Sequence, residues 1–218
     1  AVVIGLLSQH ELQLTIGDRL GDLSFQMADK LDRGMFERLR EIQLMSHSKL
    51  MRDANSPLSD KREALEDAKR NMPAHAWIAI TDAKGVVLAA TGGLLEGMNV
   101  SARPWFAPAM QGPYIGDVHG ALLLAKHLPA QPDGNLRFVD VAAPIVASSG
   151  ELLGVLCSHL TWAWAREVEA SLFQNIKDTR NVDVFVFSDN VEPLLVPSGT
   201  TAESWPKLPQ LLSTMPSG

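Results

Sequence analysis

The sequence contains a single cysteine, Cys157, among its 218 residues. One thiol excludes an intramolecular disulfide framework and a cluster of thiolates around a metal ion. Because Cys157 stands in an apolar segment of β-type residues, we expect it to be a small buried hydrophobic side chain. The low cysteine count does not by itself assign a compartment.

An excess of positive charge is also lacking. Lysine and arginine number 19 against 25 acidic residues, which gives a formal net charge of -6 and an isoelectric point near 5.5. No cluster of basic residues interleaves with aromatic ones, so the chain offers no electrostatic field for a polyanion. We expect no nucleic-acid partner.

Catalytic motifs are the third absence. The sequence has no Gly-x-Ser-x-Gly elbow, no phosphate-binding Gly-x-x-x-x-Gly-Lys loop and no His-Glu-x-x-His helix. Ser158 and His159 are neighbours in a predicted strand and therefore point to opposite faces, which prevents a nucleophile and base pair. Asp117, His119 and His127 could ligate a metal, but their spacing matches no compact metal motif. The sequence predicts no enzyme, no metal site and no cofactor.

Long hydrophobic runs are missing as well. The apolar residues 1–7 are too few to span a bilayer, which needs about 20. They are either the end of a transmembrane helix or the apolar beginning of a soluble helix. With 46% hydrophobic residues, the chain can nevertheless bury a substantial core in one large domain or two small ones.

The clearest pattern present is an apolar stripe in the first 50 residues. Its positions recur at steps of three and four, as on one face of an amphipathic helix: Leu12, Ile16, Leu20, Leu23, Met27, Leu31, Met35, Leu39, Ile42 and Met45. A helix from about residue 8 to about residue 53 would be roughly 70 Å long. It either packs along the chain's own sheet or pairs with a partner helix, and we prefer a homodimer through this helix.

The remainder alternates strands with short helices. Residues 77–82 and 86–91 flank the turn 83–85 and predict a β-hairpin. An antiparallel meander is predicted from three later β-type segments, 121–128, 136–143 and 151–160, separated by turn-rich stretches. Helices are expected over about 59–71, before Pro73, and over about 161–179, followed by a strand at 182–187.

This order and spacing resemble the Cache family of extracytoplasmic sensor domains, a PAS-like fold of bacterial chemoreceptors, histidine kinases and diguanylate cyclases. The resemblance rests on five signatures, at residues 81–88, 103–106, 112–114, 141–145 and 154–160. It implies an α+β fold in which a long N-terminal helix precedes one or two PAS-like antiparallel sheet domains. It also implies a periplasmic domain of an inner-membrane protein.

A double Cache organisation implies four segments. Residues 1–53 form a stalk helix, 54–164 a membrane-distal ligand-binding module, 165–180 a connecting helix, and 181–218 the start of a second module that is reduced or truncated. The resemblance favours the first interpretation of residues 1–7, since such domains follow a membrane-spanning helix.

Arg103 is the residue with the most distinctive chemistry. Pro104 favours an extended backbone at Arg103, and Trp105 and Phe106 follow, so the guanidinium is expected beside aromatic surface. Such a group can hold a carboxylate or another planar anion through bidentate hydrogen bonds. Alternatively, Arg103 stacks on the aromatic rings or pairs with a nearby aspartate.

The resemblance implies a ligand role for this run. Amine-and-carboxylate-sensing Cache domains use an Arg-x-Trp-Tyr run with a later tyrosine, which Arg103, Trp105 and Tyr114 match, whereas Phe106 lacks the hydroxyl. The family's upstream tyrosine falls at about Met98, and its late-strand aspartate falls at about His159.

An imidazole at His159 cannot replace a carboxylate as the counter-charge of an ammonium group. We therefore expect an organic acid or a planar heterocycle rather than a standard amino acid. Asp140, which shares a strand face with Phe138 and Ala142, needs a partner such as Arg103, Lys126 or the ligand. The predicted ligand-binding residues are Arg103, Trp105, Phe106, Tyr114, Asp117, His119, Asp140 and His159.

Two functions follow from these patterns. The first is an extracytoplasmic small-molecule sensor that signals through its long helix to an output domain. The second is a helix-mediated dimerisation or interaction module whose PAS-like pocket is filled by its own side chains. Replacing Arg103 by alanine separates them, because a sensor loses its ligand response while a structural arginine costs stability.

Overall fold

The computed structural model describes residues 2–120, 137–174, 182–188 and 193–197, with the side chains of residues 2–10 and 12 left out. The chain divides into two compact units, residues 1–164 and 165–218. Among the described residues, no helix combines the length and the apolar character that crossing a membrane requires.

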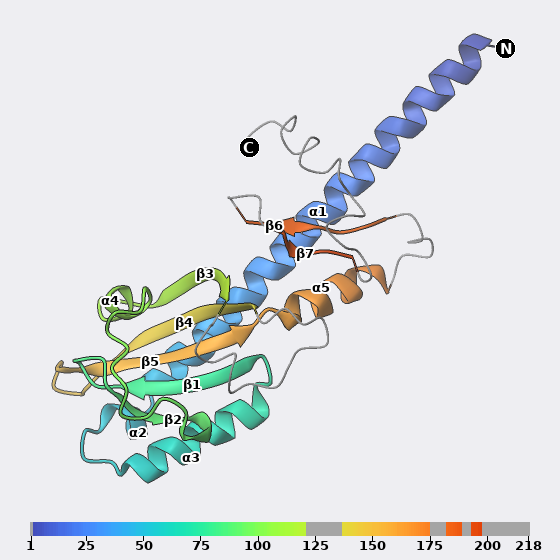
Figure 1. Ribbon diagram of the computed structural model, residues 1–218. Coiled ribbons are helices and arrows are strands. Elements are labelled where there is room, and N and C mark those ends of the chain that lie inside the picture. Colours follow the sequence, from blue (N-terminus) through green and yellow to red (C-terminus); the bar gives the residue numbers. More distant parts are fainter. Residues whose placement is uncertain (1, 121–136, 175–181, 189–192, 198–218) are drawn as a thin grey trace. The chain divides into compact units, whose positions relative to one another are not determined.

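The predicted long helix is present as α1, Val2–Ser46, with 45 residues. Figure 1 shows it as the blue helix that begins at the N-terminus. The predicted end near residue 53 is wrong, because His47 and Ser48 interrupt the helix. The Ser48 side chain accepts a hydrogen bond from the Met51 amide and so caps a separate short helix, α2 (Lys49–Arg52).

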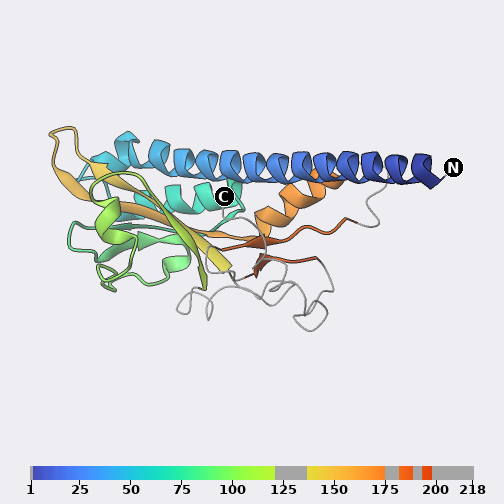
Figure 2. The ribbon, with the colours of Figure 1, turned by 90° about the horizontal axis from the view of Figure 1, so that it is seen from above.

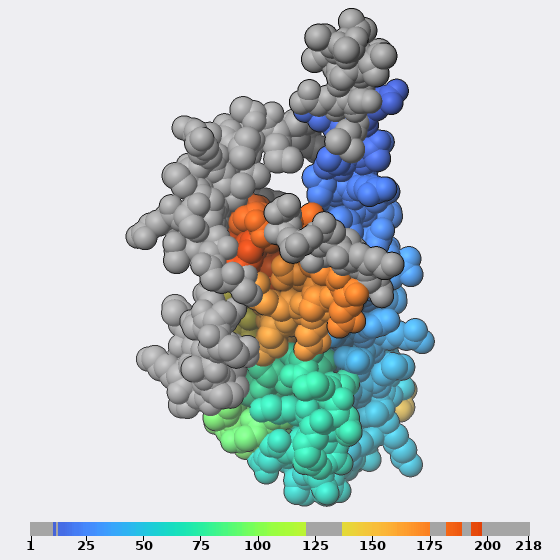
Figure 3. Space-filling view, turned by 90° about the vertical axis from the view of Figure 1, so that its right-hand side faces the viewer, coloured from blue at the N-terminus to red at the C-terminus, as the bar shows by residue number. Residues whose placement is uncertain are grey.

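The apolar stripe of α1 is buried against the sheet in one half of the helix and exposed in the other. In the C-terminal half, Met35, Leu39, Ile42 and Met45 pack against the sheet of the same chain. In the N-terminal half, Ile16 and Leu20 are exposed. Packing on the chain's own sheet, one of the two interpretations of the stripe, therefore holds for the second half of the helix. Figure 3 shows the surface of α1 beside that of α3.

Helix α3 (Leu58–Asn71) confirms the predicted helix before Pro73. Leu65 faces the core and is fully buried. Arg62 forms a bidentate ion pair with Glu96, with nitrogen–oxygen distances of 2.8 and 2.6 Å, and this pair ties α3 to the loop after β2. The guanidinium holds the pKa of the Glu96 carboxyl below its usual value.

Five strands form one antiparallel sheet in the order β2-β1-β5-β4-β3. Their bounds are β1 His75–Thr81, β2 Val87–Ala90, β3 Tyr114–Gly120, β4 Arg137–Val146 and β5 Leu152–Thr161. The predicted β1–β2 hairpin and the pairing of the last two meander strands are confirmed. Strand β3 was not predicted, and the predicted strand at residues 121–128 lies outside the described residues.

The turn between β1 and β2 depends on Asp82 and Gly85. Asp82 Oδ1 accepts hydrogen bonds from the amides of Lys84 and Val86 at 2.9 and 2.8 Å. Gly85 has a φ of +85°, and a Cβ there would lie 2.7 Å from the Cβ of Ser101. Only glycine fits both the left-handed backbone and this close approach.

Side chains alternate between two buried faces of the sheet. The helix-covered face carries Ile78, Ile80, Val139, Val141, Leu156 and Leu160, and packs against Ile42 of α1, Met51 of α2 and Leu65 of α3. The opposite face, here called the cavity face, carries Trp77, Phe138, Val155 and Cys157, and is covered by residues 94–114, which include the short helix α4 (Phe106–Ala109). Figure 2 shows α1 and α3 on one side of the sheet.

Cys157 confirms the expectation of a buried hydrophobic side chain, with 1% of its surface exposed. Burial raises the pKa of the thiol well above its usual value, and the charge of Asp140 acts in the same direction.

The second unit contains most of α5 (Ala163–Phe173) and a two-stranded antiparallel sheet of β6 (Val186–Phe187) and β7 (Pro193–Leu195). The predicted helix at 161–179 is confirmed over the α5 residues. The predicted strand at 182–187 is reduced to its last two residues. Within this unit, the Arg166 guanidinium donates to the carbonyl of Val196 at 2.6 Å. The tail at 200–218 lies outside the described residues.

Candidate ligand-binding site

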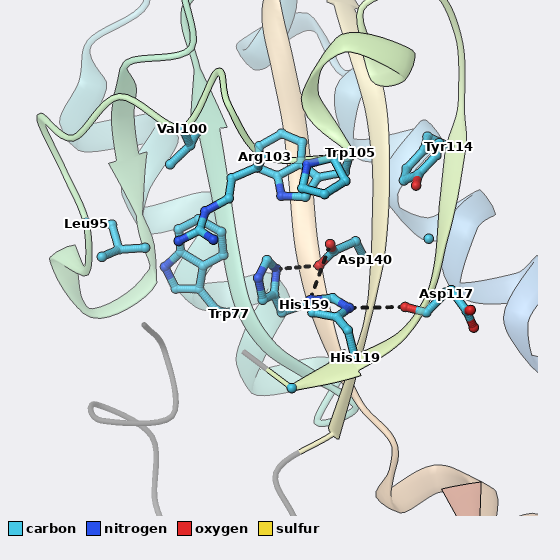
Figure 4. A pocket seen from close by; sticks show the side chains of 13 residues that line it. Trp77, Leu95, Val100, Arg103, Trp105, Tyr114, Asp117, His119, Asp140 and His159 are labelled. Atoms are coloured by element: carbon cyan, nitrogen blue, oxygen red, sulfur yellow. Dashed lines mark hydrogen bonds and ion pairs between the residues drawn. The ribbon is translucent and has the colours of Figure 1, made fainter. Parts of the chain in front are cut away.

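A cavity of about 360 Å³ opens on the cavity face of the sheet, below residues 95–105. Seven of the eight predicted ligand-binding residues line it: Arg103, Trp105, Tyr114, Asp117, His119, Asp140 and His159. The sequence did not single out the other lining residues, which are Trp77, Leu95, Val100, Pro104, Gly116 and Gly120. Figure 4 shows these side chains around one common space.

Two positions in the predicted site lie elsewhere. Phe106 does not line the cavity but packs in the core behind it, edge-on to Trp105 with ring centroids 5.8 Å apart. Met98, the position of the family's upstream tyrosine, is exposed and is not among the lining residues. Arg103 and Trp105 therefore line the cavity, whereas Phe106 packs in the core behind Trp105.

Arg103 is held by the turn that carries it rather than by its own side chain. Its amide donates to the Val100 carbonyl at 2.9 Å, and its carbonyl accepts from the Phe106 amide at 3.0 Å. Within the described part of the chain, the guanidinium forms no ion pair, so the alternatives with Asp117 and Asp140 are not realised. An exposed guanidinium at the rim of a cavity is a donor site for a planar anion.

Asp140 is the buried charge of the site, with 6% of its surface exposed. Its Oδ1 lies 3.0 Å from His159 Nδ1, and its Oδ2 lies 3.5 Å from His119 Nε2. Among the described residues, two histidines rather than the candidate partner Arg103 approach Asp140, and the candidate Lys126 lies outside the described residues.

The strand register explains this arrangement. Asp140 on β4 pairs directly with His159 on β5, so both side chains leave the sheet at the same point. The cavity therefore contains a carboxylate, that of Asp140, beside the imidazole of His159.

Aromatic rings form the apolar wall of the cavity. Trp77 and Trp105 are almost fully buried, and the Trp77 ring meets His159 edge-on, with centroids 5.2 Å apart. Trp77 on β1 is paired with His159 on β5 in the antiparallel sheet. Since β1 and β5 are far apart in the chain, only the strand order reveals that Trp77 belongs to the site.

Gly116 makes room beside the charged end of the cavity. A Cβ at this position would lie 3.3 Å from the Asp140 Cβ, a tight contact, and Tyr114 stands half-buried two residues earlier. With guanidinium donors at the rim, a carboxylate and two imidazoles inside and two tryptophans as walls, the cavity suits a small polar molecule with a flat or anionic group.

A second polar cluster lies on the helix-covered face. His75 Nδ1 is 2.8 Å from Ser158 Oγ, and His75 Nε2 is 2.9 Å from Glu41 Oε2 on α1. Burial lowers the pKa of His75, although the hydrogen bond and the charge of Glu41 act in the opposite direction. Ser158 is completely buried and donates to the Trp77 carbonyl at 2.9 Å, so its hydroxyl is closed to a substrate. The prediction that Ser158 and His159 face opposite sides is confirmed.

Comparison with known proteins shows similarity at the level of structure. The chain matches no family model, and no curated protein sequence matches it.

Solved structures match over most of the chain. An extracellular ligand-binding receptor of Desulfohalobium retbaense aligns over 90% of this chain with a TM-score of 0.62 and 13% identity. The ligand-binding domain of the Pseudomonas aeruginosa amino acid chemoreceptor PctC, in complex with GABA, aligns over 87% with a TM-score of 0.59 and 17% identity. That of the Campylobacter jejuni chemoreceptor Tlp3, in complex with L-valine, aligns over 80% with a TM-score of 0.56 and 9% identity.

These similarities show the fold. The chain has the α+β fold of extracellular ligand-binding sensor domains of bacterial receptors, with a long N-terminal helix and an antiparallel sheet, and this confirms the predicted Cache-type fold. The chain spans 34% of the Desulfohalobium receptor chain and 82% of the PctC chain.

Proposed function

We propose that this chain is the extracytoplasmic small-molecule sensor domain of a bacterial transmembrane receptor. The observation that carries the proposal is the cavity of about 360 Å³ with Arg103 at its rim, whose guanidinium has no ion pair with a described residue, and the buried carboxylate of Asp140 inside. A cavity filled by its own side chains would leave neither group facing open space.

The ligand we propose is a small organic acid or a planar heterocycle with an anionic group. Arg103 binds the carboxylate, and the Trp77 and Trp105 rings enclose the body of the molecule. The ligands named with PctC and Tlp3, GABA and L-valine, also carry a carboxylate. Because His119 and His159 already approach the Asp140 carboxylate, a free ammonium group is the less suitable partner there.

Strand β5 supplies a route from the cavity to α1. His159 faces the cavity, and its neighbour Ser158 faces the other side, where it contacts His75 and, through His75, Glu41 of α1. A ligand that favours one position of β5 would therefore favour one position of α1. Only a difference in affinity between two such states can transmit a signal.

The long helix provides both the output and the proposed dimer contact. Its exposed apolar side chains include Ile16, Leu20 and Phe25, the last with 73% of its surface exposed. We propose that α1 pairs with its counterpart in a homodimer and connects the domain to the membrane of an inner-membrane receptor. The output domain would be that of a histidine kinase, a diguanylate cyclase or a chemoreceptor.

The second candidate function is a helix-mediated interaction module without a small-molecule ligand. The exposure of Phe25, Phe36 and Leu44 along α1 favours it, because such apolar side chains are typical of a surface that binds a partner. This candidate predicts that the cavity residues contribute to stability only.

A thermal-shift screen against organic acids, amino acids, amines and purines separates the two candidates. A ligand at a hundred times its dissociation constant stabilises the fold by about 2.7 kcal/mol. We expect a hit among the carboxylates that Arg103→Ala abolishes and that Arg33→Ala, an exposed arginine on α1 paired with Asp29, retains. No hit in any class, or a hit indifferent to Arg103→Ala, contradicts the proposed sensor site.

A further inference from the structure

Three side chains at the inner end of the cavity bring two imidazoles and one carboxylate together. His119 comes from β3, Asp140 from β4 and His159 from β5, and one ligand atom of each lies within 4.8 Å of the others. In Figure 4, dashed lines join each of the two imidazole rings to the Asp140 carboxylate. Imidazole nitrogen and carboxylate oxygen are the donors that bind Zn²⁺ and its neighbours in the first transition row.

Two buried atoms of this cluster have no hydrogen-bond partner among the described residues. Asp140 Oδ1 and His159 Nδ1 lie 3.0 Å apart as an ion pair, but their relative orientation makes no hydrogen bond, and no other described residue bonds to either atom. Asp140 has 6% of its surface exposed and His159 has 9%, so both residues are more than nine-tenths buried. Buried polar atoms are normally satisfied, so an unsatisfied pair aimed into a cavity needs an explanation. A cation coordinated by both atoms satisfies them together.

His119 is oriented as a metal ligand is. Its Nδ1 lies 3.1 Å from the backbone carbonyl of Asp117, which can only accept, so Nδ1 carries the proton of this contact. In a neutral imidazole, Nε2 then carries a lone pair, and this atom lies 3.5 Å from Asp140 Oδ2. Histidines that bind metals characteristically donate their other ring N–H to a backbone carbonyl or carboxylate in this way.

We propose that His119, Asp140 and His159 form a binding site for a divalent transition-metal ion, with Zn²⁺ as its representative. Donors about 2.0–2.2 Å from a tetrahedral zinc ion lie roughly 3.3 Å from one another. The distance from His159 Nδ1 to Asp140 Oδ1, 3.0 Å, and that from His119 Nε2 to the other oxygen, Asp140 Oδ2, 3.5 Å, are both close to that value. His119 stands on the edge strand β3 with 39% of its side chain exposed, so it can close the remaining separation by a side-chain rotation.

Three protein ligands leave coordination positions open toward the cavity. Water or an anionic oxygen completes such a site. Because Arg103 lines the same cavity, a carboxylate bound to the metal also comes within the reach of a guanidinium. The inference goes beyond the proposed function, since the metal site requires neither the organic ligand nor a receptor.

The metal ligands differ from those considered in the sequence. Of the residues considered there, His119 keeps its role and Asp117 contributes its backbone carbonyl, whereas His127 lies outside the described residues. The prediction of no metal site depended on spacing along the chain. Spacing could not reveal a site whose ligands come from three strands that are neighbours only in the sheet.

Isothermal titration calorimetry of the full chain with ZnCl2 and NiCl2 tests the site. The protein is produced without a polyhistidine tag and treated with a chelator. We expect one bound ion per chain, with affinity reduced at least about tenfold in His119→Ala and in His159→Ala. His47→Ala is the matched control, since His47 Nδ1 also contacts a backbone carbonyl but has no ion pair in the described chain. Its affinity should equal that of the wild type.

Cobalt substitution and circular dichroism complete the test. Co²⁺ should give visible absorption bands of a low-coordinate nitrogen–oxygen site, and His119→Ala should lose them while keeping its circular dichroism. Absence of saturable binding to the wild type, or equal binding by His119→Ala, overturns the metal site. Arg103→Ala separates it from the proposed function, because this variant should keep the metal and lose the organic ligand.

Discussion

The two faces of the five-stranded sheet differ in what their alternating residues do. On the helix-covered face, Ile78, Val141 and Leu156 are closed in by apolar side chains of α1, α2 and α3. On the cavity face, the same strands carry Trp77, Asp140 and His159 toward an open space. Successive residues of one strand thus belong to different environments.

This difference shows where stability and binding reside. The helix-covered face is mostly apolar, and its buried contacts favour folding, with the contact of His75 with Ser158 and Glu41 as a polar exception. The cavity face leaves Asp140 Oδ1 and His159 Nδ1 buried without a hydrogen bond, which costs stability that a bound molecule or ion can restore. Trp162 Nε1, which packs on the helix-covered face, is also buried without a partner among the described residues, so it is the open cavity beside Asp140 and His159 that indicates a binding site.

The largest effect should come from breaking the helix-covered face. Ile42→Ala removes a side chain with no exposed surface from the contact between α1 and the sheet. We expect a loss of about 2–5 kcal/mol in the free energy of unfolding, measured with urea. Leu44→Ala on the same helix, at 65% exposure, should cost less than about 0.5 kcal/mol. Equal losses in the two variants would mean that α1 does not pack on the sheet.

The polar contact across the helix-covered face should have an intermediate effect. Ser158→Ala leaves the buried Nδ1 of His75 without its partner, and we expect a loss of about 1–3 kcal/mol by urea unfolding. Ser24→Ala, an exposed serine that bonds its own helix, is the control and should be nearly neutral. If Ser158→Ala is as stable as wild type, the contact from β5 through His75 to α1 contributes nothing to the free energy of unfolding.

The pH dependence of stability sharpens the same contact. Since burial lowers the pKa of His75 in the folded state, the unfolded chain binds this proton more readily. The stability is therefore full above the unfolded value of about 6.5 and is lost as the pH falls toward the lowered folded value. Urea unfolding of wild type and His75→Gln between about pH 8 and about pH 5 measures the difference. A variant with an unchanged pH slope contradicts the assignment.

The smallest effect concerns the thiol behind the cavity. Cys157 is buried and its pKa is raised, so in the native protein it should react with a thiol reagent far more slowly than in urea. Rapid native labelling, followed by absorbance, would show that the cavity face opens behind β5.

The sequence predicted where the strands lie along the chain better than which strands are neighbours in the sheet. Alternation placed Phe138, Asp140 and Ala142 on one face correctly, and the Arg103 turn was recognised from its own residues. Strand β3 was missed, because Gly116, Asp117 and Gly120 give it a weak apolar pattern. Its half-exposed edge position explains why the alternation is not hydrophobic.

The composition of the site depended on strand order, which local patterns do not contain. Asp140 meets His159, and Trp77 faces the same ring, only because β5 lies between β1 and β4. The sequence therefore indicated seven of the lining residues but did not indicate that His119 and His159 approach Asp140. The end of α1 was misplaced for a different reason, since Ser48 can either continue a helix or cap the next one.

The claim that one face of the sheet supplies stability and the other binds the ligand is tested most directly with the Arg103→Ala variant. Two properties of this variant are measured: its free energy of unfolding and its affinity for a carboxylate found in the screen. We expect an unfolding free energy within about 0.5 kcal/mol of wild type, because the exposed guanidinium has no ion pair or hydrogen bond with a described residue. We also expect that binding is lost. A variant that unfolds more easily yet binds as wild type would contradict the assignment of the cavity face to ligand recognition.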